Sequence, residues 1–335
     1  MKSDQIPFQA RVLRFAAVVS LASVLAACQS PADQPRLTVA SSGKISSLDP
    51  AQASTLSTTQ LLSALGDPLY SLDEEGELIP RLASAAPEIS KNGLTVSIPL
   101  RRDVLFHDGS RFDAEAMAFS IRRFLSIGTL SYVVGDRIAA VEVANPYRLL
   151  LKLRRPSTSL VGLLTSVNLT PISPKAYFNH KDRFLHDRFV GTGPYKLTSF
   201  SEHQQRLEPF NNYWDTPPSN DGLDLITLSN STALFGALTS GEVDVLLSAS
   251  IDEDQRHALH EMALQGQLHE GQGPAMGIGY VTLLSNVEPL NDRRLRQALA
   301  LSLDRKEIST RVSYGLRQPL QSLVPPSLPG GQRPS

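Results

Sequence analysis

Two histidines one helical turn apart, His257 and His260, are the side chains whose spacing best suits metal chemistry. Imidazole nitrogen is a common ligand of nickel, zinc and copper, and residues at i and i+3 lie on one side of a helix. Glu253 or Glu261 would add a carboxylate to the same helix. A charged pattern of this kind is also typical of a helix face in contact with water. We favour that interpretation and retain the histidine pair as a weak candidate metal site.

A third histidine lies in Phe106-His107-Asp108-Gly109, where an imidazole and a carboxylate, the groups of a general base, are neighbours. An Asp-Gly pair also suits a tight turn, and the phenyl ring suits a core, so we interpret the motif as structural. No Gly-x-Ser-x-Gly, His-Glu-x-x-His or Ser-x-x-Lys motif occurs in a matching context. We therefore predict that the protein is not an enzyme, and we expect no cofactor.

Gly191-Thr192-Gly193-Pro194 places two glycines around one threonine. A phosphate-binding loop would run directly into a helix and carry Gly-Lys-Ser, and neither feature is present. We predict instead that these glycines let the backbone pass close to another segment where the chain crosses between lobes. Trp214, next to Tyr213, is expected to pack against protein rather than to form a platform for a ligand.

The only cysteine, Cys28, follows a segment that is typical of an export signal. Three basic residues lie within the first 14 positions, and residues 15–27 carry no charge. That uncharged run is shorter than the ~20 residues of a membrane-spanning helix. Its end, Leu25-Ala26-Ala27-Cys28, resembles a bacterial lipobox, in which the thiol accepts a diacylglyceryl group. We expect a lipoprotein signal peptide over residues 1–27 and a lipid anchor on a membrane surface facing outward.

The composition excludes several classes of protein. The chain has 335 residues, 41% of them hydrophobic, and its 32 Lys and Arg nearly balance its 33 Asp and Glu. This length allows one large or two medium domains with buried cores. With a net charge of −1, the chain lacks the excess of basic residues that nucleic-acid binding requires. One cysteine cannot form a disulfide framework. We therefore expect a folded protein without a nucleic-acid partner.

Strands and helices that would position these residues follow one another along the chain. Strands are predicted by apolar alternation, and helices by apolar residues spaced three and four apart after a capping residue. The predicted strands are 36–41, 94–100, 141–143, 148–153, 195–200, 205–210, 223–228, 243–247 and 278–284. The predicted helices are 57–65, one capped by Asp113, one capped by Asn230 or Ser231, 252–264, and one from Asn291 or Asp292 to Leu303.

The unit that runs from strand 223–228 through a helix to strand 243–247 is the most informative. A crossover of this size implies parallel pairing in an α/β sheet. Gly241 occupies the position after the helix where a left-handed residue is common. Ligands bind outside the carboxyl ends of parallel strands, which directs attention to residues 247–250.

Nine motifs, collinear from about residue 36 to residue 320, resemble those of the family 5 extracellular solute-binding proteins. These are the dipeptide, oligopeptide and nickel receptors of bacterial ABC importers. The motifs are 47–50, 67–70, 80–83, 100–109, 112–116, 191–197, 211–214, 241–244 and 291–299. Each is weak alone, but their common order identifies the chain as a member of this family.

This resemblance implies an α/β, type II periplasmic-binding-protein-like fold with two lobes and an extra inserted domain. Residues 28–53 and 190–275 would form the discontinuous first lobe, residues 54–189 the inserted second domain, and residues 276–335 the start of the second lobe. Family members continue well past this point. The resemblance therefore implies a C-terminally truncated chain with an incomplete second lobe, which alone binds peptide poorly or not at all.

In the family, the lobes close over an extended peptide that is held largely through its main chain. The resemblance implies a small peptide or similar solute as ligand, ABC permease subunits as partners, and a place outside the cytoplasmic membrane. Its motif positions imply ligand contacts from Ser54, Thr55, Leu56, Leu247, Ser248 and Tyr280. A nickel or metal-chelate receptor of the same family is the alternative, with His257 and His260 as its candidate ligands.

Overall fold

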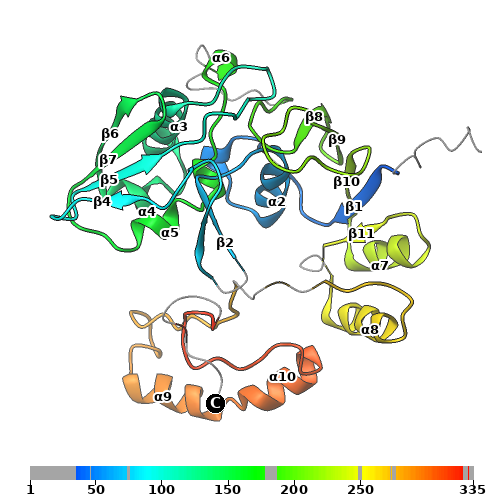
Figure 1. The fold of residues 1–335 in the computed structure, drawn as a ribbon. Coiled ribbons are helices and arrows are strands. Elements are labelled where there is room, and N and C mark those ends of the chain that lie inside the picture. Colours follow the sequence, from blue (N-terminus) through cyan, green and yellow to red (C-terminus); the bar gives the residue numbers. More distant parts are fainter. Residues whose placement is uncertain are drawn as a thin grey trace, which may run out of the picture.

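The computed structural model describes residues 35–45, 47–73, 76–177, 187–247, 251–271, 273, 277–326 and 331. The predicted signal peptide, the lipid-attachment residue Cys28 and the candidate contact Ser248 lie outside these residues. Two larger sheets and the helices that cover them form most of the described structure (Figure 1). No helix among the described residues is long and apolar enough to cross a membrane.

The first sheet has five strands in the order β11–β1–β10–β9–β8. They are β1 (Leu37–Ser41), β8 (Tyr195–Phe200), β9 (Gln204–Pro209), β10 (Leu223–Thr227) and β11 (Val245–Leu246). β10 and β11 are parallel, as predicted for the crossover unit, but they do not pair with each other. Instead β1 lies between them and is parallel to both, while β9 and β8 extend the sheet in antiparallel fashion. β11 is also shorter than predicted, because only two of its residues face β1.

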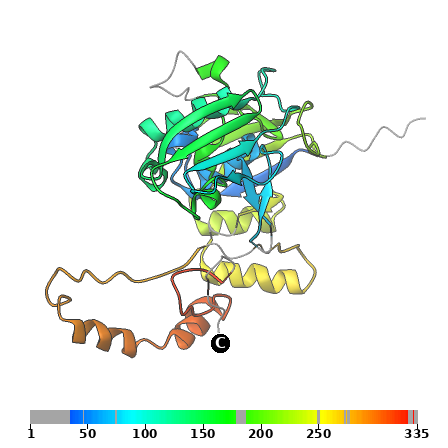
Figure 2. The same ribbon diagram turned by 60° about the vertical axis from the view of Figure 1, so that its left-hand side comes forward.

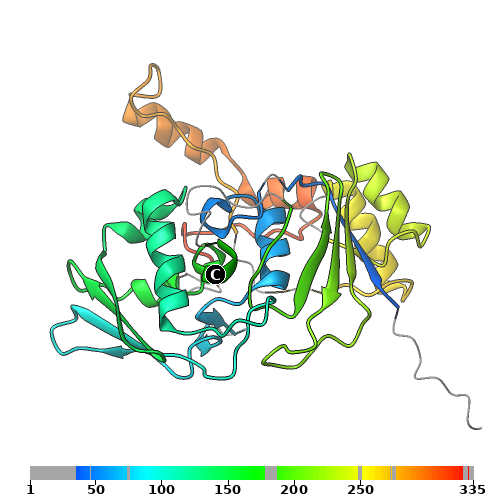
Figure 3. The ribbon, with the colours of Figure 1, turned by 90° about the horizontal axis from the view of Figure 1, so that it is seen from above.

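Helices cover both faces of this sheet (Figure 3). On one face, Leu61, Leu62 and Leu65 of α2 (Leu56–Leu65) pack against Leu207 and Leu223. The other face is covered by α7 (Ser231–Thr239) and α8 (Glu253–Leu264). By its packing α2 therefore belongs to the five-stranded layer, although the predicted boundary at residue 54 assigns it to the inserted domain. The predicted domain division remains a prediction.

The second sheet is antiparallel, with the order β4–β5–β7–β6. Its main helix is α3, whose Met117 and Phe124 are buried with Ile98 and Leu151 of the sheet. Asp113 caps this helix, as predicted, by accepting a hydrogen bond from Ala116 N at 2.9 Å. The elements of this unit are β2 (Tyr70–Leu72), β3 (Leu78–Pro80), β4 (Glu88–Ile89), β5 (Thr95–Pro99), α3 (Ala114–Ile127), α4 (Ser131–Gly135), β6 (Ile138–Asn145), β7 (Arg148–Leu153) and α5 (Leu160–Leu163), whereas α6 (Pro174–Tyr177) packs with α2. We call it the four-stranded unit. Two short 3-10 helices, η1 (Pro50–Gln52) and η2 (Val167–Leu169), lie in contact where this unit meets the five-stranded sheet. Leu169 is buried in the core of the four-stranded unit, to which we therefore assign η2.

The last elements, α9 (Arg293–Ser302) and α10 (Arg305–Ser313), lie apart from both sheets (Figure 2). No residue of α9 is buried, whereas α10 contacts α8. The predicted strand at 278–284 is wrong, since these residues form no strand in the structure. A strand requires a neighbour for its N–H and C=O groups, and no described strand pairs with this segment.

Candidate functional site

The carboxyl ends of the three parallel strands meet at one edge of the five-stranded sheet. Leu228 N donates to Ser41 O at 3.0 Å, and Leu247 N donates to Ala40 O at 3.2 Å. These bonds bring Ser41, Leu228 and Leu247 next to one another, and we call this edge the carboxyl edge. It is the position at which open α/β sheets bind ligands.

The N-terminus of α2 lies beside the carboxyl edge. The loop after β1 approaches it so closely that a Cβ atom on Gly43 would stand 1.7 Å from Ser57 Oγ. Thr55 caps the helix, with its Oγ1 accepting from Thr58 N at 3.3 Å. Ser54, Thr55 and Leu56 are exposed, and the exposed fraction of Leu56 is 55%. The structure thus brings residues 54–56 and Leu247 to the same edge.

Residues 54–56 offer a ligand three kinds of contact. The hydroxyl groups of Ser54 and Thr55 can donate or accept hydrogen bonds. The first turn of a helix presents backbone N–H groups and a positive dipole end, which favour a carboxylate. The exposed Leu56 supplies an apolar surface. Together these groups suit a small ligand that has both a carboxylate and apolar atoms.

Tyr280, the remaining candidate contact, is 72% exposed. Among the described residues, no hydrogen bond or ring contact joins Tyr280 to Thr55 or Leu247, so the structure does not group it with them. The two candidate metal ligands have separate neighbours. His257 stacks on Tyr314 with 4.1 Å between ring centroids, and His260 Nδ1 lies 2.7 Å from Glu270 Oε2. The described part of the chain contains no cluster of three metal-binding side chains.

The glycine motif lies directly against α2. A Cβ atom on Gly193 would stand 2.4 Å from Gly66 N and 2.4 Å from Leu65 C. A similar atom on Gly191 would stand 2.5 Å from Leu65 O. The prediction that these glycines permit close backbone passage is therefore confirmed.

His107 holds the glycine motif to the four-stranded unit. Its Nε2 donates to Gly193 O at 3.1 Å, and its Nδ1 accepts from Gly191 N at 3.4 Å. Burial lowers the pKa of His107 from 6.5 to about 4, although the carbonyl groups of Gly193 and Phe189 act in the opposite direction. Asp108 instead accepts hydrogen bonds from Ser110 and Ser173. The imidazole and the carboxylate therefore have separate partners, as the structural interpretation of the motif predicts.

Trp214 belongs to a polar network around the buried Asp67. Its Nε1 donates to Asp67 Oδ2 at 3.0 Å, and Tyr213 OH donates to Asp67 Oδ1 at 2.9 Å. Burial, followed by the nearby Asp67 charge, raises the pKa of Tyr213. The guanidinium groups of Arg81 and Arg101 lie 4.9 and 4.2 Å from the centre of the Trp214 ring. The indole therefore packs against protein, as predicted.

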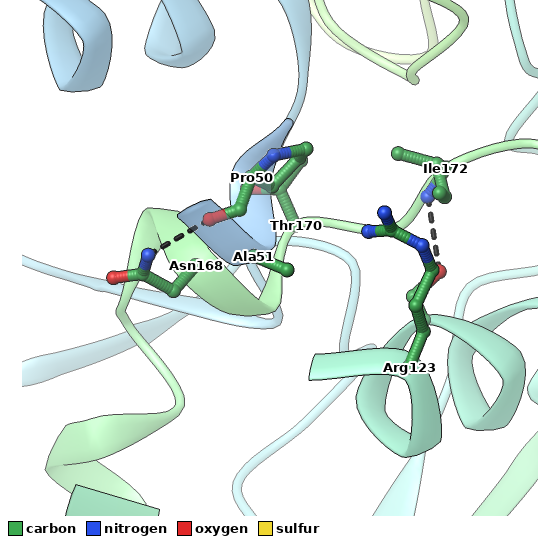
Figure 4. A pocket seen from close by; sticks show the side chains of 7 residues that line it. Pro50, Ala51, Arg123, Asn168, Thr170 and Ile172 are labelled. Atoms are coloured by element: carbon green, nitrogen blue, oxygen red, sulfur yellow. Dashed lines mark hydrogen bonds between the residues drawn. The ribbon is translucent and has the colours of Figure 1, made fainter. Parts of the chain in front are cut away.

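Sequence reasoning missed Arg123 and Asn168, which hold the loop before residue 54. Arg123 Nη1 and Nη2 each lie 2.6 Å from an oxygen of Asp49. Asn168 Nδ2 donates to Pro50 O at 2.8 Å (Figure 4). A signal for Arg123 was available, because helical spacing places it on the buried face of α3 with Ser120. The small hollow among these residues has room for about one water molecule, so it cannot hold a peptide.

Comparison with known proteins finds one matching family and similar relatives. Residues 77–335 match the family described as bacterial extracellular solute-binding proteins, family 5 Middle. The glutathione-binding protein GsiB of Salmonella paratyphi A is 26% identical over 320 residues, which cover 94% of this chain and 61% of GsiB. The chain thus spans about three fifths of the length of this relative.

Two solved structures are similar in fold. The dipeptide binding protein of Pseudoalteromonas sp. SM9913, in complex with Met-Leu, has a TM-score of 0.75 and 22% identity. The match covers 87% of this chain and 61% of that protein. NikA from Brucella suis, in complex with Fe(III)-EDTA, has a TM-score of 0.75, 21% identity, and coverages of 90% and 61%. These similarities confirm the predicted α/β fold class of type II periplasmic binding proteins.

Proposed function

Because the chain belongs to the bacterial extracellular solute-binding proteins of family 5, we propose that it binds a small peptide outside the cytoplasmic membrane for delivery to an ABC permease. The observation that carries this proposal is the position of the exposed residues 54–56 beside the carboxyl edge, where Leu247 also lies. A peptide carboxylate would face the first turn of α2, and an apolar side chain would cover Leu56.

Peptide binding by this chain should be weak, with a dissociation constant above the micromolar range. Ser54, Thr55 and Leu56 are exposed, so a ligand that contacts them leaves its polar groups largely in water. Hydrogen bonds and charges interact more strongly when a closing site excludes water.

Ligand-observed NMR with saturation transfer suits weak binding of this kind. The probes are Met-Leu and glutathione, which relatives are described as binding. We expect saturation transfer to at least one peptide and its loss in Leu56→Asp. The matched control is Ser63→Asp, which changes an exposed residue near the other end of α2. Absence of transfer to both peptides, or an unchanged signal in Leu56→Asp, would refute the proposal. Titration calorimetry that gives micromolar or tighter affinity would refute the expected weakness.

A metal chelate is the second candidate ligand, since the similar NikA structure contains Fe(III)-EDTA. His257 Nδ1 is buried and has no hydrogen-bond partner in the described part of the chain. Titration with Ni²⁺ and histidine tests this alternative. If His257→Ala and the unmodified chain bind equally, the imidazole is not a ligand.

We also propose that Cys28 carries a lipid that anchors the protein to a membrane, based on its position in Leu25-Ala26-Ala27-Cys28. Expression in a bacterium with radiolabelled palmitate should label the unmodified chain but not Cys28→Ser. Equal labelling, or recovery of an unacylated chain from the cytosol, would contradict the anchor.

A further inference from the structure

The loop of residues 49–53, which we call the connecting loop, joins the five-stranded sheet to residues 54–56. Ser54, Thr55 and Leu56 are exposed, and Thr55 Oγ1 bonds to Thr58 of α2. Ser54 directly follows Ala53, so a displacement of the loop would also displace Ser54 and the cap of α2. The side chains that hold this loop come from the four-stranded unit.

Arg123 of α3 provides the charged contact. Its two terminal nitrogens meet the two carboxylate oxygens of Asp49 at 2.6 Å, and both side chains are less than a tenth exposed. Such a paired geometry fixes orientation as well as distance. Asp49 Oδ1 in turn accepts from Ala51 N at 3.0 Å, so the guanidinium also orders the start of η1.

Asn168 of η2 provides the neutral contact, and it acts on both ends of η1. Its Nδ2 donates to Pro50 O at 2.8 Å and to Ala53 O at 2.9 Å (Figure 4). Pro50 O and Ala53 O can only accept, so the amide NH2 must face the loop, and Asn168 Oδ1 accepts from Ser166 Oγ at 3.1 Å. Ala53 directly precedes Ser54, so the amide holds the last residue before the candidate contacts.

The end of α3 adds further bonds to the same loop. Gln52 Nε2 donates to Ile127 O at 2.6 Å, and Thr129 N donates to Ala51 O at 3.0 Å. The connecting loop is thus bound at successive residues to the four-stranded unit. None of these bonds involves an atom of residues 54–56.

We propose that Arg123 and Asn168 are positioning residues for the ligand contacts at residues 54–56, so that the four-stranded unit supports ligand binding without touching the ligand. This inference rests on the proposed function for its consequence in binding. Its structural part concerns the order of the connecting loop alone.

Asn168→Ala tests the inference because it removes two neutral hydrogen bonds while leaving the buried ion pair intact. Hydrogen exchange of the full chain reports on the amides of Gln52, Ala53 and Thr59, each of which donates to a backbone carbonyl. We expect exchange at these amides to be about tenfold faster in Asn168→Ala, and the Met-Leu saturation-transfer signal to weaken about as much.

The matched control is Asn92→Ala, which also removes two neutral hydrogen bonds of an asparagine, those from Ser90 Oγ and Leu94 N in the turn between β4 and β5. It should leave exchange in the connecting loop and Met-Leu binding nearly unchanged under conditions where the chain is folded. A second variant, Asp49→Asn combined with Arg123→Gln, removes the charges without leaving one of them unpaired. It should also increase exchange in the loop.

Exchange in Asn168→Ala equal to that of the unmodified chain, or increased equally by Asn92→Ala, would overturn the inference. If the unmodified chain binds no peptide, the proposed function fails, whereas the exchange experiment still decides whether these residues order the loop. Faster exchange with unaltered Met-Leu binding would refute the link between loop order and ligand contact.

Discussion

Replacement of His107 by glutamine should remove a specific part of the pH dependence of stability. In the folded chain, Nε2 donates to Gly193 O, and Nδ1 accepts from Gly191 N. A second proton on the ring would place an N–H group at Nδ1 against the N–H group of Gly191. Burial opposes this proton as well, and the pKa of His107 is lowered from 6.5 to about 4.

The sign of the effect follows from the lowered pKa. Between pH 6.5 and pH 4 the unfolded chain binds a proton at this position more readily than the folded chain does, so acid favours unfolding. The contribution of His107 to stability is complete above pH 6.5 and is lost as the pH falls towards 4. A change in pKa from 6.5 to about 4 corresponds to about 3 kcal/mol in total, most of which is lost by pH 4.5.

Urea unfolding at several pH values from 7 to 4.5, followed by the fluorescence of the single tryptophan Trp214, measures this loss. We expect His107→Gln to be less stable than the unmodified protein at pH 7, but to lose about 2 to 3 kcal/mol less of its unfolding free energy on acidification to pH 4.5. The exposed His203 provides the control, and His203→Gln should lose as much stability as the unmodified protein. An equal acid-induced loss in His107→Gln and the unmodified protein would refute the argument.

Four further substitutions test close packing, a glycine within a helix, hydrogen bonding and capping through the free energy of unfolding in urea. Gly193→Ala should lower it by about 1–3 kcal/mol, because a Cβ atom meets backbone atoms. Gly236→Ala adds a Cβ atom in open space beside α7 and should raise the free energy of unfolding by about 0.5–1 kcal/mol. Full stability in Gly193→Ala would contradict the close approach of Gly193 to the backbone of Leu65 and Gly66. Trp214→Phe removes a donor to the buried Asp67 and should lower it by about 1–3 kcal/mol, so retention of full stability would show that the bond contributes little. Asp113→Ala removes the cap of α3 and should lower it by about 1 kcal/mol, whereas no change would mean that solvent replaces the cap.

Local signals predicted many of the elements correctly. β1, α2, α7, α8 and the hairpin of β6 and β7 lie within a few residues of their predicted positions. The caps by Asp113 and Asn230 are confirmed, and Gly241 has the predicted positive φ of 77°. Each of these features depends on residues a few positions apart, so the sequence contains the whole of the necessary information.

Fewer features of the candidate site than of the helices and strands could be predicted from the sequence. Ser54, Thr55, Leu56 and Leu247 came from family resemblance, and the structure brings them to one edge. Their roles as ligand contacts remain predictions. The supporting residues Arg123 and Asn168 were not predicted, because their partners Asp49 and Pro50 lie 74 and 118 positions away.

The amino-acid sequence by itself determined the local elements, their caps and the collinear motifs of the family, since each is encoded by neighbouring side chains. Only the tertiary structure decided that β1 separates β10 from β11, that α2 covers the five-stranded sheet, and that residues 278–284 form no strand. These outcomes depend on which distant backbone supplies hydrogen-bond partners and which apolar face is free to be covered. A pattern of alternating residues shows that a segment is able to form a strand, but a strand forms only where another strand is available to pair with it.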